Sequence, residues 1–184
     1  MLFRSDVPYL GKCSLPNGVR SYPCREAYGL IFVFPGDPAR AASVPFPDVP
    51  AAVDPAYKTR WLDRRIGCHY TFFHENLMDM NHQFLHRRLM GSIKATLLGS
   101  AQGADWVEAR YTFDRVEGRA SLGETFMIGS AKTETTKNDE MAIRTVNPYQ
   151  TLTFTQAGNK ESALDLWLAY VPVDKEQQIG RAHV

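Results

Sequence analysis

The sequence predicts an α+β fold in which one long helix lies on an antiparallel β-sheet. Residues 75–91 contain no proline and reach glycine only at Gly91, which is typical of a helix of about four turns. From Ser92 onward, apolar and polar residues alternate, as they do in strands with one buried face. Short strands separated by turn-rich segments indicate an antiparallel sheet. The layer between helix and sheet is a natural place for an apolar ligand.

Alternation and turn residues also set the expected strands. Before the helix, Gly67 to Phe73 is expected as a strand, and Gly29 to Pro35 as a short buried strand that closes a small β domain. Between them, residues 35–55 hold six of the eleven prolines, which indicates an extended linker at a domain boundary. Six strands are expected after the helix: Ser92 to Leu98, Trp106 to Phe113, Ala120 to Ile128, Met141 to Thr145, Thr151 to Thr155 and Leu164 to Val171.

The composition excludes several classes of protein. A net charge of +1 gives no strong field for nucleic acid or for an acidic membrane surface. No apolar run approaches the roughly 18 residues of a membrane span, and the first residues do not form a signal peptide. Three cysteines do not make a disulfide framework. We therefore expect a cytoplasmic protein with no nucleic-acid or membrane partner.

Polar residues line one side of the expected helix. At about 100° per residue, Glu75, Asp79, His82 and His86 fall within an arc of about 60°. His82 and His86 are one turn apart, so their rings can converge on one ion, and imidazole suits Fe, Cu, Ni and Zn. Asp79 is placed to accept the other ring N–H of His82. A carboxylate from elsewhere would complete the two-histidine, one-carboxylate site of a non-haem Fe(II) oxygenase, although two histidines on one face also occur merely solvated or hydrogen-bonded.

The same residues carry a resemblance to a known family. Asn76-Leu-Met-Asp79-Met-Asn-His82, followed by His86, resembles the iron-site motif of the Rieske non-haem iron oxygenases, the α-subunit family of aromatic ring-hydroxylating dioxygenases. The family usually has four residues between the two histidines, whereas this chain has three. Two longer stretches are also similar to the family: Arg20 to Asp37 to the last strands of the Rieske domain, and Leu164 to Asp174 to a late catalytic-domain strand.

This resemblance implies a helix-grip (START-like) catalytic domain in which His82 and His86 bind a mononuclear Fe(II). It implies that Asp79 orients His82 and bridges to a cluster ligand on the next subunit of a homotrimer, and that Asn76 lies near the iron without binding it. Electrons would come from NAD(P)H through a reductase, and in some systems a ferredoxin, to a [2Fe-2S] cluster and then to the iron. With O₂, the enzyme would act as a monooxygenase or dioxygenase that hydroxylates or demethylates an aromatic or otherwise apolar substrate.

The resemblance also predicts the domain organisation. Residues 1–36 are expected as the C-terminal remnant of a Rieske [2Fe-2S] domain, 37–55 as the linker and 56–178 as a partial catalytic domain. The cluster motifs CxH and CxxH are not in the sequence, so Met1 is expected to be an internal start. One DNA reading of residues 179–184 resembles a sequencing adapter, so we exclude them from the fold. The third ligand, an aspartate, would then lie beyond the chain, and this fragment is expected to be inactive.

Two other functions fit the same residues. A zinc hydrolase would hold zinc at His82 and His86, but it needs a third ligand and a water position, and no third ligand has suitable spacing. A helix-grip binding module for an apolar ligand would need no metal. The polar side chains on one side of its helix would then face solvent or a hydrogen-bonded interior.

Overall fold

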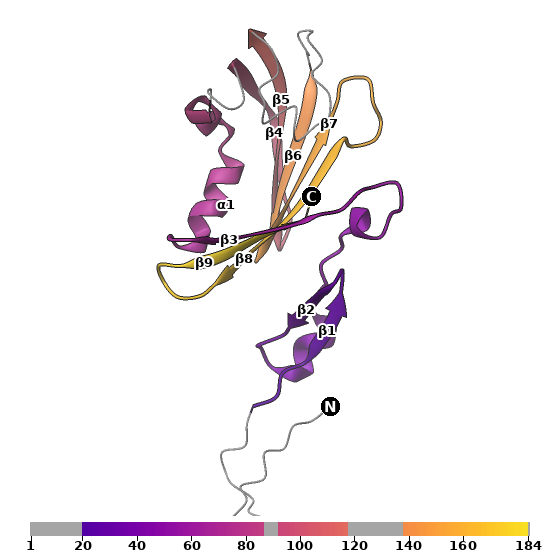
Figure 1. Cartoon of the computed structure of the whole chain (residues 1–184), viewed down its shortest axis with the longest axis vertical. Coiled ribbons are helices and arrows are strands. Elements are labelled where there is room, and N and C mark those ends of the chain that lie inside the picture. Colours follow the sequence, from indigo (N-terminus) through magenta and orange to yellow (C-terminus); the bar gives the residue numbers. More distant parts are fainter. Residues whose placement is uncertain (1–19, 87–91, 118–137, 184) are drawn as a thin grey trace, which may run out of the picture. The chain divides into compact units, whose positions relative to one another are not determined.

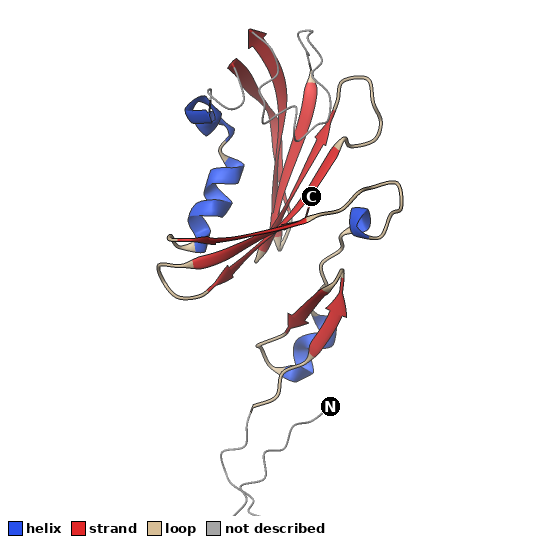
Figure 2. Ribbon diagram, in the orientation of Figure 1, coloured by secondary structure: helices blue, strands red, loops and turns tan. Residues whose placement is uncertain are grey.

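The computed structural model describes residues 20–86, 92–117 and 138–183. The chain divides into two compact units, Met1–Val53 and Asp54–Val184. Figure 1 labels the elements along the chain, and Figure 2 separates helices from strands.

The first unit contains a two-stranded hairpin of β1 (Cys24–Ala27) and β2 (Leu30–Val33). Tyr28 and Gly29 form its turn with φ of 54° and 71°, and two positive values suit the right-handed twist of a tight hairpin. The strand expected at Gly29 to Pro35 is therefore confirmed as β2. The expectation that it is buried is wrong, because Ile31 is 75% exposed on this narrow sheet.

The segment expected as a linker carries two short 3₁₀ helices, η1 (Pro38–Ser43) and η2 (Pro50–Ala52). Phe46, between them, packs edge-on against Phe32 with ring centres 4.8 Å apart. The Tyr28 hydroxyl donates to the Pro47 carbonyl over 3.2 Å. These contacts give the first unit a small aromatic core.

The second unit is a seven-stranded antiparallel sheet in the order β3-β9-β8-β7-β6-β5-β4. The helical segments α1 and η3 lie over one of its faces (Figure 1). The strand bounds are β3 (Trp61–Ile66), β4 (Ser92–Gln102), β5 (Trp106–Glu117), β6 (Asp139–Val146), β7 (Tyr149–Thr155), β8 (Leu164–Pro172) and β9 (Gln178–His183).

Five of the six strands expected after the helix are confirmed as β4 to β8, with ends that run further than the alternation indicated. Ala120 to Ile128 lies outside the described residues. The turn between β4 and β5 depends on Gly103, where a Cβ atom would lie 2.3 Å from the Trp106 indole nitrogen. The β6–β7 turn contains a cis peptide bond between Asn147 and Pro148.

The single four-turn helix expected over residues 75–91 is wrong. Helix α1 (Tyr70–Met78) begins five residues earlier, and the chain continues after Asp79 as the 3₁₀ helix η3 (Met80–His86). The break has a local cause, because the Asp79 carboxylate accepts the Asn81 N–H over 2.9 Å and so caps a new helical segment. No described helix combines the length and the apolarity needed to cross a membrane.

The strand expected at Gly67 to Phe73 is also wrong. The strand there is β3, which ends at Ile66. The aromatic residues that follow belong to α1 instead, because the His69 ring accepts the Thr71 N–H over 3.5 Å and caps the helix. Phe73 then packs against Tyr170 with ring centres 5.6 Å apart.

The expectation that residues 179–184 do not belong to the fold is wrong for residues 179–183. They belong to β9, which pairs with β3 on one side and with β8 on the other. Strand pairing uses main-chain groups, so these residues need no distinctive side-chain pattern to complete the sheet. The adapter origin of these residues stays a prediction.

The core lies between the helical layer and the sheet. It comprises Met80 of η3 and four buried side chains of the sheet, Phe113, Ile143, Leu152 and Phe154. Ile143 is wholly buried. The residues that precede the histidine pair are therefore held directly against the sheet.

Candidate metal centre

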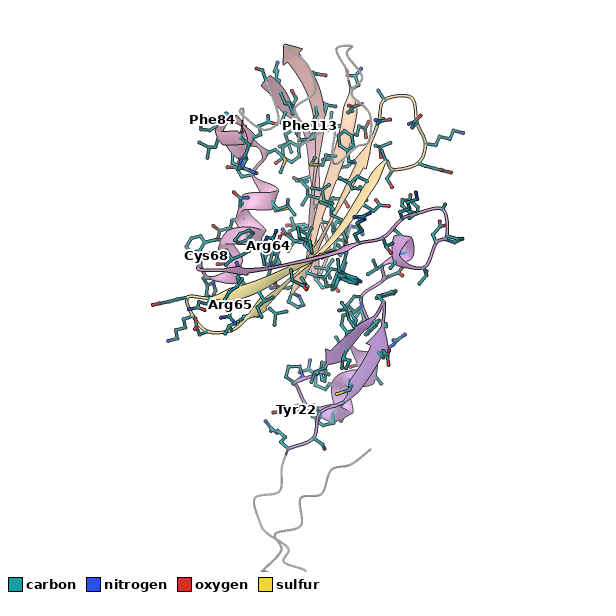
Figure 3. All side chains as sticks on the ribbon, in the orientation of Figure 1. Tyr22, Arg64, Arg65, Cys68, Phe84 and Phe113 are labelled. Carbon is teal, nitrogen blue, oxygen red and sulfur yellow. The ribbon has the colours of Figure 1, made fainter. Side chains whose placement is uncertain are left out.

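The candidate centre is built on η3, which follows the helix break at Asp79. Met80 is 6% exposed and faces the core, whereas the next residues turn toward the surface. His82 is half-buried, and His86 is exposed. Figure 3 shows Phe84 of η3 and Phe113 of β5 at the same end of the unit, so the histidine pair belongs to this end of the layer.

The structure brings the two histidine rings together. Their centres are 5.3 Å apart and their planes are at 89°. Because a metal–imidazole bond is about 2.1 Å long, two imidazoles on one ion have ring centres about 5 Å apart. The rings are thus close to the separation that a shared ion needs. In a 3₁₀ helix, which has three residues per turn, residues four apart do not lie directly above one another.

The local hydrogen bonding favours one tautomer of His82. Its Nδ1 contacts the main-chain carbonyl of Asp79. A carbonyl can only accept, so Nδ1 carries the proton and Nε2 keeps its lone pair for a metal. The donor set therefore fits an imidazole-binding ion such as iron, and the ring is oriented as metal-bound histidines usually are.

The other expected site residues lie nearby in different arrangements. Asp79 contacts His82 through its main-chain carbonyl, while its carboxylate accepts the Asn81 N–H. Asn76 is exposed on α1, before the break. Within the described residues, no three His, Cys, Asp or Glu side chains gather around one point.

Tyr111, which the sequence did not single out, contacts the break from the sheet. Its hydroxyl donates to the Met78 carbonyl over 2.8 Å. Burial raises the pKa of this hydroxyl above 10, the charge of Asp79 raises it further, and the Met80 N–H opposes both. The alternation of β5 places Tyr111 on the same face as Phe113, but alternation alone does not identify the carbonyl that its hydroxyl meets.

His74 is buried in α1 and was not singled out by the sequence. Its ring meets Tyr170 edge-on, with centres 4.8 Å apart. Neither ring nitrogen has a hydrogen-bond partner in the part of the chain that the structure describes. Burial lowers its pKa below 6.5, so the neutral ring is the favoured form. Its main-chain carbonyl accepts from Gln150 over 3.0 Å, which ties α1 to β7.

Comparison with known sequences identifies relatives of this region. The family described as vanillate O-demethylase oxygenase C-terminal domain matches residues 66–181. The 4β-methylsterol monooxygenase of Methylococcus capsulatus is 33% identical over 145 residues, which are 76% of this chain and 37% of that protein. The oxygenase component of dicamba O-demethylase from Stenotrophomonas maltophilia is 44% identical over 70 residues, 38% of this chain and 21% of that protein. The chain thus spans well under half the length of these relatives.

Solved structures share the fold. The crystal structure of dicamba monooxygenase bound to 3,6-dichlorosalicylic acid has a TM-score of 0.68 and 23% identity, over 90% of this chain and 50% of that one. The terminal oxygenase of carbazole 1,9a-dioxygenase from Nocardioides aromaticivorans has a TM-score of 0.56 and 19% identity, over 96% and 50%.

These likenesses confirm the expected antiparallel sheet with few helices, similar to the helix-grip catalytic domain. The resemblance that began with the motif from Asn76 to His86 is confirmed over most of the second unit. The chain belongs to the Rieske non-haem iron oxygenases, in the family of vanillate O-demethylase oxygenase C-terminal domains.

Proposed function

We propose that this chain forms the iron-holding part of an oxygenase component that hydroxylates or demethylates an aromatic or otherwise apolar substrate. The observation that carries the proposal is the paired imidazoles of His82 and His86, 5.3 Å apart, with Nδ1 of His82 turned to the Asp79 carbonyl. Family membership supports Fe(II) as the ion. A related structure of dicamba monooxygenase contains non-haem iron and dicamba.

The chain's own residues have separate tasks in this proposal. His82 and His86 bind the metal, and Asp79 orients His82 through its main chain. Asn76 lies near the metal without binding it, as the family resemblance implies. Bound Fe(II) would supply the activation of O₂ beside the substrate. The third ligand, a carboxylate, comes from outside the described residues.

The apolar layer around Met80, Phe113 and Ile143 supports an apolar substrate, because small-molecule sites are lined predominantly by apolar side chains. The names of two relatives point the same way, one to a methylated sterol and the other to dicamba. Phe113 itself is 7% exposed and belongs to the core.

The remaining parts of the system follow from the family. The domain assignments, 1–36 as a Rieske remnant, 37–55 as a linker and 56–178 as the catalytic part, remain proposals. We also propose that electrons come from NAD(P)H through a reductase or ferredoxin to a [2Fe-2S] cluster. Assembly as a homotrimer and a cytoplasmic location are part of the same proposal. Because the sequence contains neither cluster motif, the chain alone is expected to bind metal without turnover.

Anaerobic Fe(II) titration, with Co(II) as a spectroscopic substitute, tests the proposal. One equivalent should bind to the wild-type chain, and His82→Ala or His86→Ala should abolish binding. His69→Asn is the matched control, because it removes an imidazole outside the pair and keeps a side chain that can cap α1.

Each failure has a distinct meaning. Absence of histidine-dependent binding would refute the metal site and favour a binding module. A preference for Zn(II), together with hydrolysis of an ester or amide, would favour the hydrolase instead.

A further inference from the structure

The break between α1 and η3 leaves main-chain groups that a continuous helix would have paired. Helix α1 ends at Met78, and Asp79 takes φ of −93° and ψ of 92°, outside the helical region. The Met78 carbonyl and the Met80 N–H therefore lie on either side of a single extended residue. Main-chain groups left unpaired at a helix end need partners from elsewhere.

One hydroxyl of the sheet contacts the end of α1 directly before the break. Tyr111 donates its O–H to the Met78 carbonyl over 2.8 Å. Tyr111 is held in the middle of β5, where it is paired with Leu97 of β4 and Met141 of β6. The strand thus holds the hydroxyl in place, and the hydroxyl contacts the last residue of α1, which directly precedes Asp79.

The residue that follows this contact, Asp79, also meets the histidine pair. The Asp79 carbonyl contacts Nδ1 of His82, so any rotation of the Asp79 peptide turns the His82 ring. Met80 adjoins the same peptide and is packed into the core against the sheet. The chain of contacts runs from β5 through Tyr111 to the main chain around Asp79, and from there to His82.

We infer that Tyr111 is a positioning residue for the histidine pair: its hydroxyl fixes the break at Asp79 and thereby sets how His82 faces His86. The inference rests on the proposed function in assigning a metal to this pair. The geometry that it describes belongs to the metal-free chain as well. Residues that orient metal-binding histidines change metal affinity by about 10–100-fold when they are removed.

The test compares Tyr111→Phe with Tyr57→Phe. Both variants lose one half-buried tyrosine hydroxyl, but that of Tyr57 meets Ser162, 3.1 Å away, in a different part of the unit. Co(II) titration should show an affinity about tenfold lower for Tyr111→Phe, with altered visible bands, and wild-type values for Tyr57→Phe. Similar losses of stability in both variants, with unchanged Co(II) affinity in Tyr111→Phe, would show a purely structural role and overturn the inference.

A second measurement decides the inference without metal. In the metal-free full chain, nuclear Overhauser contacts between the His82 and His86 rings should weaken in Tyr111→Phe and persist in Tyr57→Phe. Unchanged ring contacts would refute the positioning role, whereas a wild-type chain that binds no Co(II) would refute the proposed function only.

Discussion

Ile143 offers a quantitative test of the layer that supports the metal pair. It is wholly buried on β6, in the cluster that also contains Met80. Ile143→Ala removes three carbon atoms, which at about 0.8 kcal/mol each gives about 2.4 kcal/mol of lost transfer free energy. The cavity left behind adds to this, so the free energy of unfolding should fall by about 3–4 kcal/mol. Ile143→Val removes one carbon and should cost about 1 kcal/mol.

Urea unfolding of the full chain, followed by circular dichroism, measures these losses. The midpoint should move and the slope should stay constant, because the surface exposed on unfolding changes little. Val107→Ala on β5 is the control, since Val107 is 39% exposed and its truncation should cost at most about 1 kcal/mol. A loss below about 1 kcal/mol for Ile143→Ala would refute a tightly packed layer beneath η3.

Three further outcomes are expected. Burial lowers the pKa of His74 below 6.5, so His74 takes up a proton in the unfolded chain at a higher pH than in the folded chain. The free energy of unfolding should therefore fall as the pH drops below about 6.5. Urea titrations should show a smaller fall in the His74→Phe variant. Burial raises the pKa of Tyr170 to about 12, so stability should decline between about pH 10 and 12, and ultraviolet titration should show one late tyrosine that Tyr170→Phe removes. Glu108→Gln weakens the 2.7 Å ion pair with Arg144; because both side chains are partly solvated, thermal unfolding should reveal a change of only about 0–1 kcal/mol.

The sheet could be predicted because its strands alternate clearly. In β7, Gln150, Leu152 and Phe154 are buried, and the residues between them are partly or fully exposed. This period of two is visible in the sequence and reflects one buried face. The sequence pattern did not reveal β3, because this strand carries three consecutive charged residues, Asp63 to Arg65. It is also the first strand in the order of the sheet, and among the described strands it pairs with β9.

The histidine pair could be predicted from composition and spacing, but its geometry could not. Residues 75–86 contain no proline or glycine to end a helix, and the local feature that favours a break is the Asp79 carboxylate, which accepts the Asn81 N–H. Tyr111 also contacts the break, from a position 32 residues away from Asp79, and this contact depends on the register of β5. A contact with a side chain on a distant strand is not visible in a single sequence.

Strand β4 bears on how this protein behaves in concentrated solution. It is the last strand of the sheet, paired on one side by β5 among the described strands, and Leu97 and Leu98 are 56% and 53% exposed. An edge of this kind can recruit a second molecule and seed aggregates. The pairing shifts register between Leu97 and Gly99, and an incoming flat strand could not follow that irregularity without losing hydrogen bonds. The bulge thus acts as built-in protection against aggregation between copies of this chain.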